Sequence, residues 1–541
     1  MLQSLMSDDH PLTLALLFER AATQFPDNEL VSRFPDGSIH RYTYADFARR
    51  TRKLANALAT LGIEPGDRVA TLCWNEHRHL ELYFAVPLSG AVVHTLNARL
   101  HRDELTYIVN DAADSALFVH SSLLDAFEEI RDRVSVEHVI VIPDDGPTPE
   151  GYRDYEELIA DEPEQFEPPP LDERQASGMC HTSGTTGRPK GVLYSHRSTT
   201  LLALMSCMTD TVGMHERDCM LPVVPMYHAN AWGFPYAATY AGAKQVFPGR
   251  DLSAESLLGL FADEGVTLTG GVPTVFLDVL RALDERPGEW DLSAMRSLVI
   301  GGSAAPPSQI AGFDRHGLHV THAWGMTEMN PLGSIANLKR AHDGLDEADT
   351  LEVRARQGHA QPLIEFRHVA EDGVVQPWDG VALGELQVRG PTIARAYYGV
   401  DRADDFVGDG WFRTGDIVTI DEHGSILIAD RARDVVKSGG EWISSVALEN
   451  ALMAHPGVVE AAVFAAEDER WGERPLAAVV HAPGSSVEAE ELREFIAPQF
   501  LRWWLPAEFI PVDSVPKTST GKFDKVALRE RYGRRLIEGG E

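Results

Sequence analysis

The stretch Thr182–Gly191 (TSGTTGRPKG) holds the residue types that bind phosphate groups. Four hydroxyl side chains alternate with three glycines, and Lys190 adds a positive charge. Glycines let the backbone approach an anion, while hydroxyls, N–H groups and the ammonium donate to its oxygens. A Walker A loop is excluded, because Gly184 and Gly187 are too close together and Lys190 precedes glycine. We expect a phosphate-binding loop rather than a flexible surface turn.

Three later stretches place a carboxylate or a lysine beside a glycine turn. They read AWGMTE at 323–328, WFRTGD at 411–416 and PKTSTGK at 516–522. Each alone is compatible with a packing turn or an exposed tail. Lysine is scarce in this chain, with eight residues, yet Lys190, Lys437 and Lys522 all stand in Gly-rich motifs. This concentration indicates function only in combination with the other motifs.

Composition narrows the class of protein. Lys and Arg total 48 and Asp and Glu total 82 among 541 residues, a net charge of −34. Such a surface argues against general binding to nucleic acid or to anionic membranes. The four cysteines show no C-x-x-C spacing, which favours reduced thiols in the cytoplasm. The N-terminus lacks a basic signal-peptide region, and the apolar run 80–93 is too interrupted to span a bilayer.

Several apolar runs of strand length alternate with helical patterns in the first 340 residues. Strands are expected at 67–75, 91–96, 116–119, 138–143, 267–271, 297–300 and 319–323, with helical character over most of 14–62 and over 78–90. This alternation predicts layered, parallel α/β structure. Residues 144–170, rich in Pro, Asp and Glu, are expected to form a surface segment. Short alternating strands from about 353 to 428 predict a small β-barrel or sandwich.

Together the motifs resemble the adenylate-forming superfamily, which includes acyl-CoA synthetases, luciferases and peptide-synthetase adenylation domains. The family's phosphate loop, [ST]-[ST]-G-T-T-G-x-P-K-G, matches throughout, and the other motifs follow in the family's order across nearly the whole chain. The resemblance implies an α/β fold with a large N-terminal domain of layered subdomains plus the small β-barrel, residues 1–430. It further implies a small mobile α+β C-terminal domain, residues 431–541.

The resemblance also implies how ATP and Mg²⁺ would be held. Trp324 and Gly325 would contact the adenine, Thr327 the α-phosphate, and Glu328, with Thr182, the Mg²⁺ ion. Asp416 would accept from the ribose hydroxyls with help from Arg431. The implied phosphate-binding set is Thr182, Ser183, Gly184, Thr185, Thr186, Gly187 and Lys190. The loop Gly301–Pro306, through Gly302, Ser303 and Ala304, would line the adenine and acyl sites.

The C-terminal motifs imply the two reaction steps. Lys522 would be the catalytic lysine of adenylation. The run RARDVVKSGGEWISS from Arg431 resembles the hinge of fatty acyl-CoA synthetases, with Arg433 where that branch usually has Lys. Lys437, Gly439, Gly440 and Trp442 would then contact coenzyme A after a domain rotation.

The run PMYHANAW at 225–232 addresses the acid. His228 would lie beside the reacting carboxylate, and Trp232 matches a gate tryptophan of bacterial long-chain enzymes, with Gly301 and Gly325 completing the acyl site. These similarities predict an ATP-dependent acid–CoA ligase for medium- to long-chain fatty acids. The alternatives are a ligase for a short acid such as methylmercaptopropionate, an acyl-AMP ligase that loads a carrier protein, and a nucleotide-binding regulator. A homodimer is expected from the same resemblance.

Overall fold

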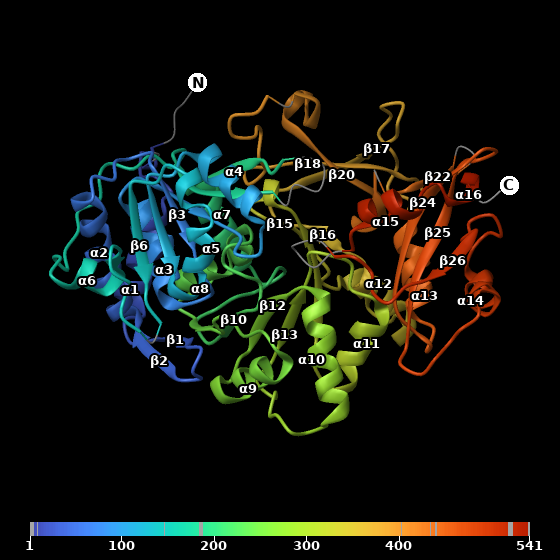
Figure 1. Cartoon of the computed structure of the whole chain (residues 1–541), viewed down its shortest axis with the longest axis horizontal. Coiled ribbons are helices and arrows are strands. Elements are labelled where there is room, and N and C mark those ends of the chain that lie inside the picture. Colours follow the sequence, from blue (N-terminus) through green and yellow to red (C-terminus); the bar gives the residue numbers. More distant parts are fainter. Residues whose placement is uncertain are drawn as a thin grey trace.

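The structure is a computed structural model that describes residues 5–7, 9–144, 146–182, 188–401, 403–432, 434–438, 441–517 and 523–538. Its described residues form three β-sheets with helices packed against them (Figure 1). Among these residues, no helix combines the length and the apolar character that crossing a bilayer requires.

The first sheet carries the phosphate-loop motif at one edge. Its described strands, in hydrogen-bonded order, are β7 (Arg153–Asp154), β6 (His138–Ile142), β5 (Ala116–His120), β3 (Arg68–Leu72), β4 (Val92–Thr95), β8 (Ala176–His181) and β9 (Gly191–Ser195). All neighbours are parallel except β8 and β9. The motif therefore connects the two strands of an antiparallel hairpin.

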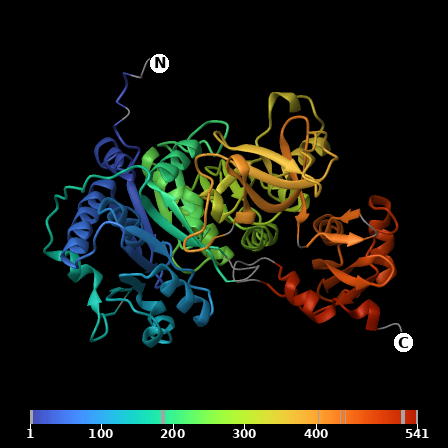
Figure 2. The same cartoon turned by 90° about the horizontal axis from the view of Figure 1, so that it is seen from above.

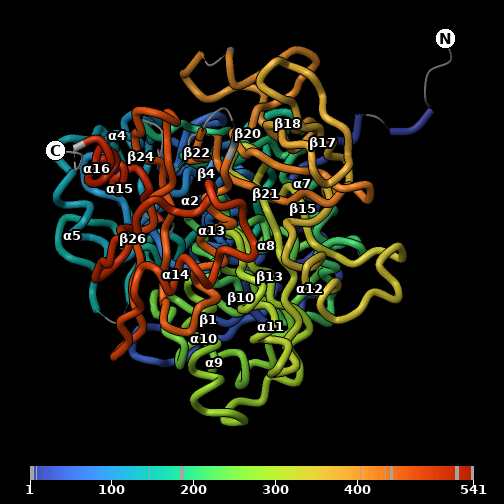
Figure 3. The backbone as a smooth tube through the Cα atoms, turned by 90° about the vertical axis from the view of Figure 1, so that its right-hand side faces the viewer, coloured from blue at the N-terminus to red at the C-terminus, as the bar shows by residue number. Residues whose placement is uncertain are grey.

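The second sheet is larger and changes character along its width. Its parallel part contains β11 (Lys244–Phe247), β10 (Cys219–Pro222), β12 (Leu268–Gly271), β13 (Ser297–Ile300) and β14 (Val320–Gly325), with β1 (Glu29–Arg33) and β2 (Ile39–Thr43) at the edge. Antiparallel pairing begins at β15 (Leu332–Ile335) and continues through β16 (Gly358–Ala360), β21 (Ser425–Arg431), β20 (Trp411–Ile420), β18 (Gly384–Arg389) and β17 (Glu365–Val369), with β19 (Phe406–Val407) beside β20. The antiparallel strands, which cover the region expected to form the small barrel, lie on the far side of the molecule from α9 (Ala254–Glu264) in Figures 1 and 3.

Helices between these two sheets supply a shared core. They are α1 (Leu14–Gln24), α2 (Tyr44–Thr60), α3 (His77–Leu88), α7 (His196–Ser206) and α8 (Phe234–Ala241). Helix α2 starts at a capping box between Thr43 and Asp46, and α8 ends at Gly242 in the left-handed region. Every residue of α3 is buried, as expected for a helix covered on both sides. The other helices of the N-terminal part are α4 (Arg102–Ala112), α5 (Leu124–Glu128), α6 (Tyr155–Ala160), α9, α10 (Pro273–Glu285), α11 (Pro307–Arg315) and α12 (Glu347–Ala355).

The third sheet belongs to a small C-terminal unit (Figure 2). Its described strands are β23 (Glu441–Ile443), β22 (Val436–Ser438), β25 (Gly472–His481), β24 (Val458–Asp468) and β26 (Glu508–Pro511). The helices around it are α13 (Ser445–Met453), α14 (Ala489–Ile496), α15 (Lys525–Tyr532) and α16 (Arg535–Glu538). This unit has cores of its own on both faces of the sheet. The expected α/β fold, with a large N-terminal and a smaller C-terminal part, is confirmed.

Two local expectations need correction. The stretch 14–62 contains the additional strand β1, which pairs with β2 in an antiparallel hairpin and with β11, more than 200 residues away, in parallel. The Pro-Asp-Gly sequence at 35–37 was the local signal for this hairpin. The segment 144–170 is not only surface, because Tyr155 and Ile159 of α6 are buried against α2. The Tyr155 hydroxyl also donates to the buried Glu81 carboxylate at 2.5 Å. The acidic composition of the segment gave no indication of this buried contact.

Candidate functional site

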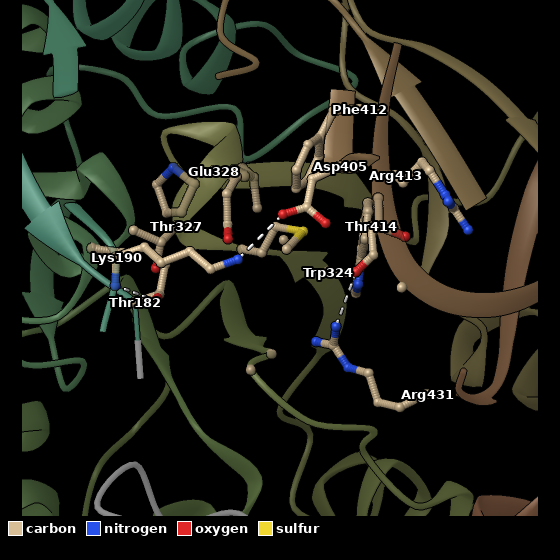
Figure 4. Close-up of a pocket in the computed structure, with 18 of the residues that line it drawn as sticks. Thr182, Lys190, Trp324, Thr327, Glu328, Asp405, Phe412, Arg413, Thr414 and Arg431 are labelled. Carbon is tan, nitrogen blue, oxygen red and sulfur yellow. Dashed lines mark hydrogen bonds and ion pairs between the residues drawn. The ribbon is translucent and has the colours of Figure 1, made fainter. Parts of the chain in front are cut away.

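A cavity of about 510 Å³ lies where the two large sheets and the C-terminal unit meet (Figure 4). The phosphate-loop hairpin contributes Thr182 and Lys190 to its wall, and the end of β14 with the following turn contributes Trp324, Thr327 and Glu328. Further lining residues named below are His228, Trp232, Gly301, Gly302, Gly325, Tyr397, Asp404, Asp405, Phe412, Thr414, Arg431, Asp434 and Phe523. Five of the seven sequence motifs, at 182–191, 225–232, 301–306, 323–328 and 411–416, thus meet at one cavity through residues that the structure describes, and Arg431 adds the start of another. The rest of that run, from Lys437 onward, and the motif at 516–522 are treated below.

One wall is organised by a buried carboxylate. Asp416 is 1% exposed, and its two oxygens accept from the Trp324 indole N–H at 3.0 Å and from Arg431 Nε at 2.9 Å. Trp324 also meets Phe366 edge to face, with the ring centroids 6.0 Å apart. Asp416 is not among the residues that line the cavity, whereas Trp324 and Arg431 are. In this state Asp416 therefore orients two wall residues from behind.

Glu328 forms the acidic point of the cavity. It is 7% exposed, and the Tyr397 hydroxyl donates to its Oε1 at 2.8 Å. Burial raises the pKa of the Glu328 carboxyl, while the hydrogen bond from Tyr397 opposes that rise. The neighbouring Thr327 is held through its carbonyl, which accepts from the Tyr194 hydroxyl of β9 at 2.8 Å.

The base of the phosphate loop is closed by its own backbone. The Thr182 N–H donates to the Lys190 carbonyl at 2.9 Å, and the Lys190 N–H donates to Thr182 Oγ1 at 3.1 Å. The Lys190 ammonium lies 4.3 Å from the centroid of the Tyr397 ring and 3.2 Å from Asp405 Oδ2. Ser183, Gly184, Thr185, Thr186 and Gly187 lie outside the described residues.

A row of two histidines and two aspartates includes His181, the residue directly before Thr182. Asp114 contacts His94 Nδ1 at 2.9 Å, His94 Nε2 lies 2.9 Å from His181 Nδ1, and His181 Nε2 lies 3.1 Å from Asp111. Three hydrogen bonds need three protons, and two neutral imidazoles bring two. Burial raises the pKa of Asp114, and the contact with His94 opposes that rise. Burial also lowers the pKa of His181 to about 4, which keeps it neutral.

The part of the cavity wall at His228 and Trp232 is built on unusual backbone. Ala229, Asn230, Ala231 and Trp232 all have φ between 43° and 59°, the left-handed region, and form one turn. This turn follows His228 and directs the Trp232 indole against the Gly301–Gly302 backbone, where a Cβ on Gly301 would lie 3.3 Å from the ring. The same Cβ would lie 2.7 Å from the Ala323 carbonyl oxygen, so only glycine fits there.

The rest of the Gly301–Pro306 loop lies outside the cavity wall. Ser303 is exposed and Ala304 is half-buried, and neither lines the cavity. The loop is anchored by His322, whose Nε2 accepts from the Ala305 N–H at 3.2 Å. Burial lowers the pKa of His322, which keeps this nitrogen available as an acceptor.

The C-terminal unit reaches the cavity at one end of its last motif. Phe523 lines the cavity and forms an isolated antiparallel bridge with Lys517, so the two ends of the segment between them are adjacent. Lys522, Arg433, Gly439 and Gly440 lie outside the described residues, as does the side chain of Trp442. Lys437 is half exposed, pairs with Glu371 at 2.8 Å and does not line the cavity. In this arrangement the expected coenzyme A residue Lys437 is therefore separate from the cavity.

Sequence reasoning missed several residues of this site. Tyr397 and Asp405 come from the connection between β18 and β19 and belong to no motif. The His94–His181 pair comes from strands β4 and β8, which are neighbours only in the folded sheet. In the sequence, the signal for this pair was His181, which directly precedes the phosphate loop.

Comparison with known proteins agrees with this arrangement. The "AMP-binding enzyme" family profile matches residues 18–398, and "AMP-binding enzyme C-terminal domain" matches residues 447–522. The chain is 48% identical to a long-chain-fatty-acid–CoA ligase of Thermus thermophilus, over 97% of this chain and 96% of that protein. It is 42% identical to a 3-methylmercaptopropionyl-CoA ligase of Ruegeria lacuscaerulensis, over 96% and 97%.

A solved structure extends the comparison to three dimensions. ATP-bound MatB from Rhodopseudomonas palustris superposes with a TM-score of 0.83 and 27% identity, covering 96% of this chain and 99% of that one. Both parts of this chain therefore have counterparts in one relative. The chain belongs to the AMP-binding enzyme family.

Proposed function

We propose that this protein is an ATP-dependent acid–CoA ligase. It joins a carboxylic acid to AMP with release of pyrophosphate, and then transfers the acyl group to the thiol of coenzyme A. The observation that carries the proposal is the meeting of Lys190, Glu328 and Phe523, the residue after the motif at 516–522, around one cavity. The two relatives named above are CoA ligases, and the similarity covers nearly their whole length, which supports the same reaction.

The first step depends on position and charge. A carboxylate attacks the α-phosphate of ATP only if its negative oxygen is held close to a group that is itself negative. Lys522 would offset the charge that gathers at the α-phosphate, and Lys190 and Thr182 would hold the β- and γ-phosphates. Trp324 would stack on the adenine and Arg431 would bind the ribose, while Asp416, behind the wall in this arrangement, would reach the ribose hydroxyls only after Trp324 or Arg431 moves aside.

The donor set near Glu328 fits Mg²⁺. Among the described residues, no cluster of three or more His, Cys, Asp or Glu side chains is arranged to hold a metal by itself. Mg²⁺ is commonly held by one carboxylate together with phosphate oxygens of the substrate, and Glu328 faces the cavity beside Thr327. The ion would neutralise phosphate charge, with Glu328 and Thr182 as its protein ligands.

The second step needs a different surface at the acyl carbon. We propose that the C-terminal unit rotates about Arg433, so that Lys522 leaves and Lys437, Gly439, Gly440 and Trp442 arrive with coenzyme A. The short connection between Arg431, where β21 ends, and Val436, where β22 begins, supports a hinge there. The pairing of Lys437 with Glu371 away from the cavity suits the state before that rotation.

The substrate is proposed to be a medium- to long-chain fatty acid. Trp232, Gly301 and Gly302 place apolar surface and backbone at the acyl end, beside His228. A short acid such as methylmercaptopropionate is the alternative, supported by the 42% identical relative. A carrier protein as acyl acceptor is the further alternative.

Release of pyrophosphate and AMP tests the proposal. Aliphatic acids of increasing length and aryl acids would each be supplied with and without coenzyme A, to the wild type, Lys522→Ala and the matched control Lys517→Ala. CoA-dependent turnover with aliphatic acids, lost in Lys522→Ala and kept in Lys517→Ala, supports the ligase. Acid-dependent ATP–pyrophosphate exchange without CoA-dependent turnover points to a carrier protein. No acid-dependent release would refute the proposal.

We further propose a cytoplasmic homodimer. All four cysteines are unpaired, which suits a reducing compartment. The dimer rests on resemblance to the superfamily, with contact through the N-terminal part. A monomeric mass in light scattering would reject it.

A further inference from the structure

The lysine of the phosphate loop is already paired across the cavity. Asp405, in the short turn Ala403–Asp405 before β19, places Oδ2 3.2 Å from Lys190 Nζ. The two side chains are 34% and 18% exposed, and Figure 4 shows them reaching toward each other beside Glu328. Both line the cavity, so the ion pair lies inside the site.

Aromatic packing fixes both ends of this ion pair. Phe406, the residue after Asp405, packs against Tyr397 with ring centroids 5.5 Å apart and against Phe412 at 5.2 Å. The Lys190 ammonium lies over the same Tyr397 ring at 4.3 Å. The Asp405 carboxylate therefore cannot withdraw far from Lys190 unless its aromatic anchor also moves.

A carboxylate and a terminal phosphate are equivalent partners for an ammonium. Both present anionic oxygens, and only one of them can take the best position at Lys190. Glu328 and Asp404 also line the cavity, so an Asp405 side chain set free by ATP adds to a local excess of negative charge. Arg413, another cation that lines the cavity, is held by Glu385 at 2.6 Å.

We propose that Asp405 occupies the position of the β- and γ-phosphates at Lys190 while the site is free of nucleotide. Asp405 thereby competes with ATP and pyrophosphate, but not with AMP. This inference rests on the proposed function, because it takes Lys190 as a phosphate-binding residue. As a consequence, the site binds ATP less tightly than it would if Lys190 were unpaired, and it releases pyrophosphate readily.

Calorimetric titration of ATP, pyrophosphate and AMP, in the absence of any acid, tests the inference. Asp405→Asn keeps the shape of the side chain and removes the charge. We expect its Kd for ATP and for pyrophosphate to fall about three- to tenfold, with the Kd for AMP unchanged. The matched control is Asp404→Asn. It removes the same charge from the neighbouring residue of the cavity wall, and so measures the effect of wall charge in general. Titrations with EDTA and with MgCl₂ separate competition for Lys190 from binding of a cation.

A second pair of variants shows whether the effect passes through Lys190. In the Lys190→Met background, Asp405→Asn should no longer improve ATP binding. An ATP affinity in Asp405→Asn that is unchanged or lower than in the wild type overturns the inference. If the ATP affinity of Asp405→Asn is lower only in the presence of MgCl₂, Asp405 is a cation ligand instead. An equal gain in Asp404→Asn also overturns it, because the effect would then be general charge. A wild type that binds neither ATP nor AMP contradicts the proposed function itself.

Discussion

Trp324 shows how one side chain serves two purposes at the residue scale. Its indole N–H satisfies one oxygen of the buried Asp416, while its ring forms part of the cavity wall. Arg431 satisfies the other oxygen from the end of β21. Because a buried carboxylate needs such donors, the position of the wall depends on residues 92 positions apart in the sequence.

Trp324→Phe separates these two purposes. The ring is kept, but Asp416 loses a donor, and an unsatisfied buried acceptor costs about 1–3 kcal/mol. We expect a lower thermal unfolding midpoint and a Kd for ATP that rises about threefold to tenfold, since the wall is no longer oriented. Calorimetry and thermal unfolding measure the two effects. Trp378→Phe, at a half-exposed tryptophan outside the cavity, is the control, and an unchanged ATP affinity in Trp324→Phe would show that this hydrogen bond does not position the wall.

At the scale of elements, helices α13 and α15 are joined under the cavity by a buried ion pair. Lys525 Nζ, at the start of α15, lies 2.7 Å from Glu449 Oε1 of α13, and both side chains are less than a tenth exposed. Asp430, at the end of the N-terminal part, accepts from the Ser445 N–H at the start of α13. Since Lys525 follows Lys522 by three residues, this contact anchors the chain directly after the last motif.

Lys525→Met alone should lower the free energy of unfolding more than removal of both Lys525 and Glu449. The single change leaves Glu449 buried without its cation, which costs about 3–5 kcal/mol of unfolding free energy. The double variant Lys525→Met/Glu449→Leu should recover part of that loss, because the Glu449 carboxylate is then no longer buried without its cation, while Asp430 still lacks Lys525. Urea unfolding followed by tryptophan fluorescence measures both.

The control for this comparison is Lys517→Met. Lys517 pairs with Glu460 in a partly exposed position, where an ion pair is worth about 1 kcal/mol or less. A double variant as unstable as Lys525→Met would mean that the cost arises from lost packing and not from the unpaired carboxylate.

On the scale of the whole molecule, buried neutral histidines link stability to pH. Burial lowers the pKa of His79 and of His196 to about 4, below the value near 6.5 of an unfolded chain. Between these values the unfolded chain binds more protons, so stability falls as the pH falls from 6.5 to 4. Each such histidine contributes a slope of about 1.4 kcal/mol per pH unit in that window.

His196→Asn tests this dependence. Asparagine can replace His196 Nδ1, which accepts from the Leu14 N–H, but it takes up no proton. The variant should be less stable than the wild type at pH 7, and the difference should shrink by pH 5. Thermal unfolding midpoints at pH 7, 6 and 5 measure it, with exposed His10→Asn as the control. A difference that stays constant with pH would locate the linkage in other groups.

The sequence by itself determined the family, the expected chemistry and most strands of the parallel layers. Those properties are local. A ten-residue phosphate motif, or an apolar run such as 297–300 or 116–119, can be recognised without knowing which distant segments pack against it. The α/β fold class and the family membership are confirmed, while the roles of individual site residues and the domain boundary at 430 and 431 stay predictions. Only the tertiary structure decided that β1 joins β11, that Asp416 lies behind Trp324, and that Asp405 meets Lys190. The physical reason is that burial and charge pairing depend on which distant segments share a sheet or face a cavity, and residue types along the chain do not carry that information.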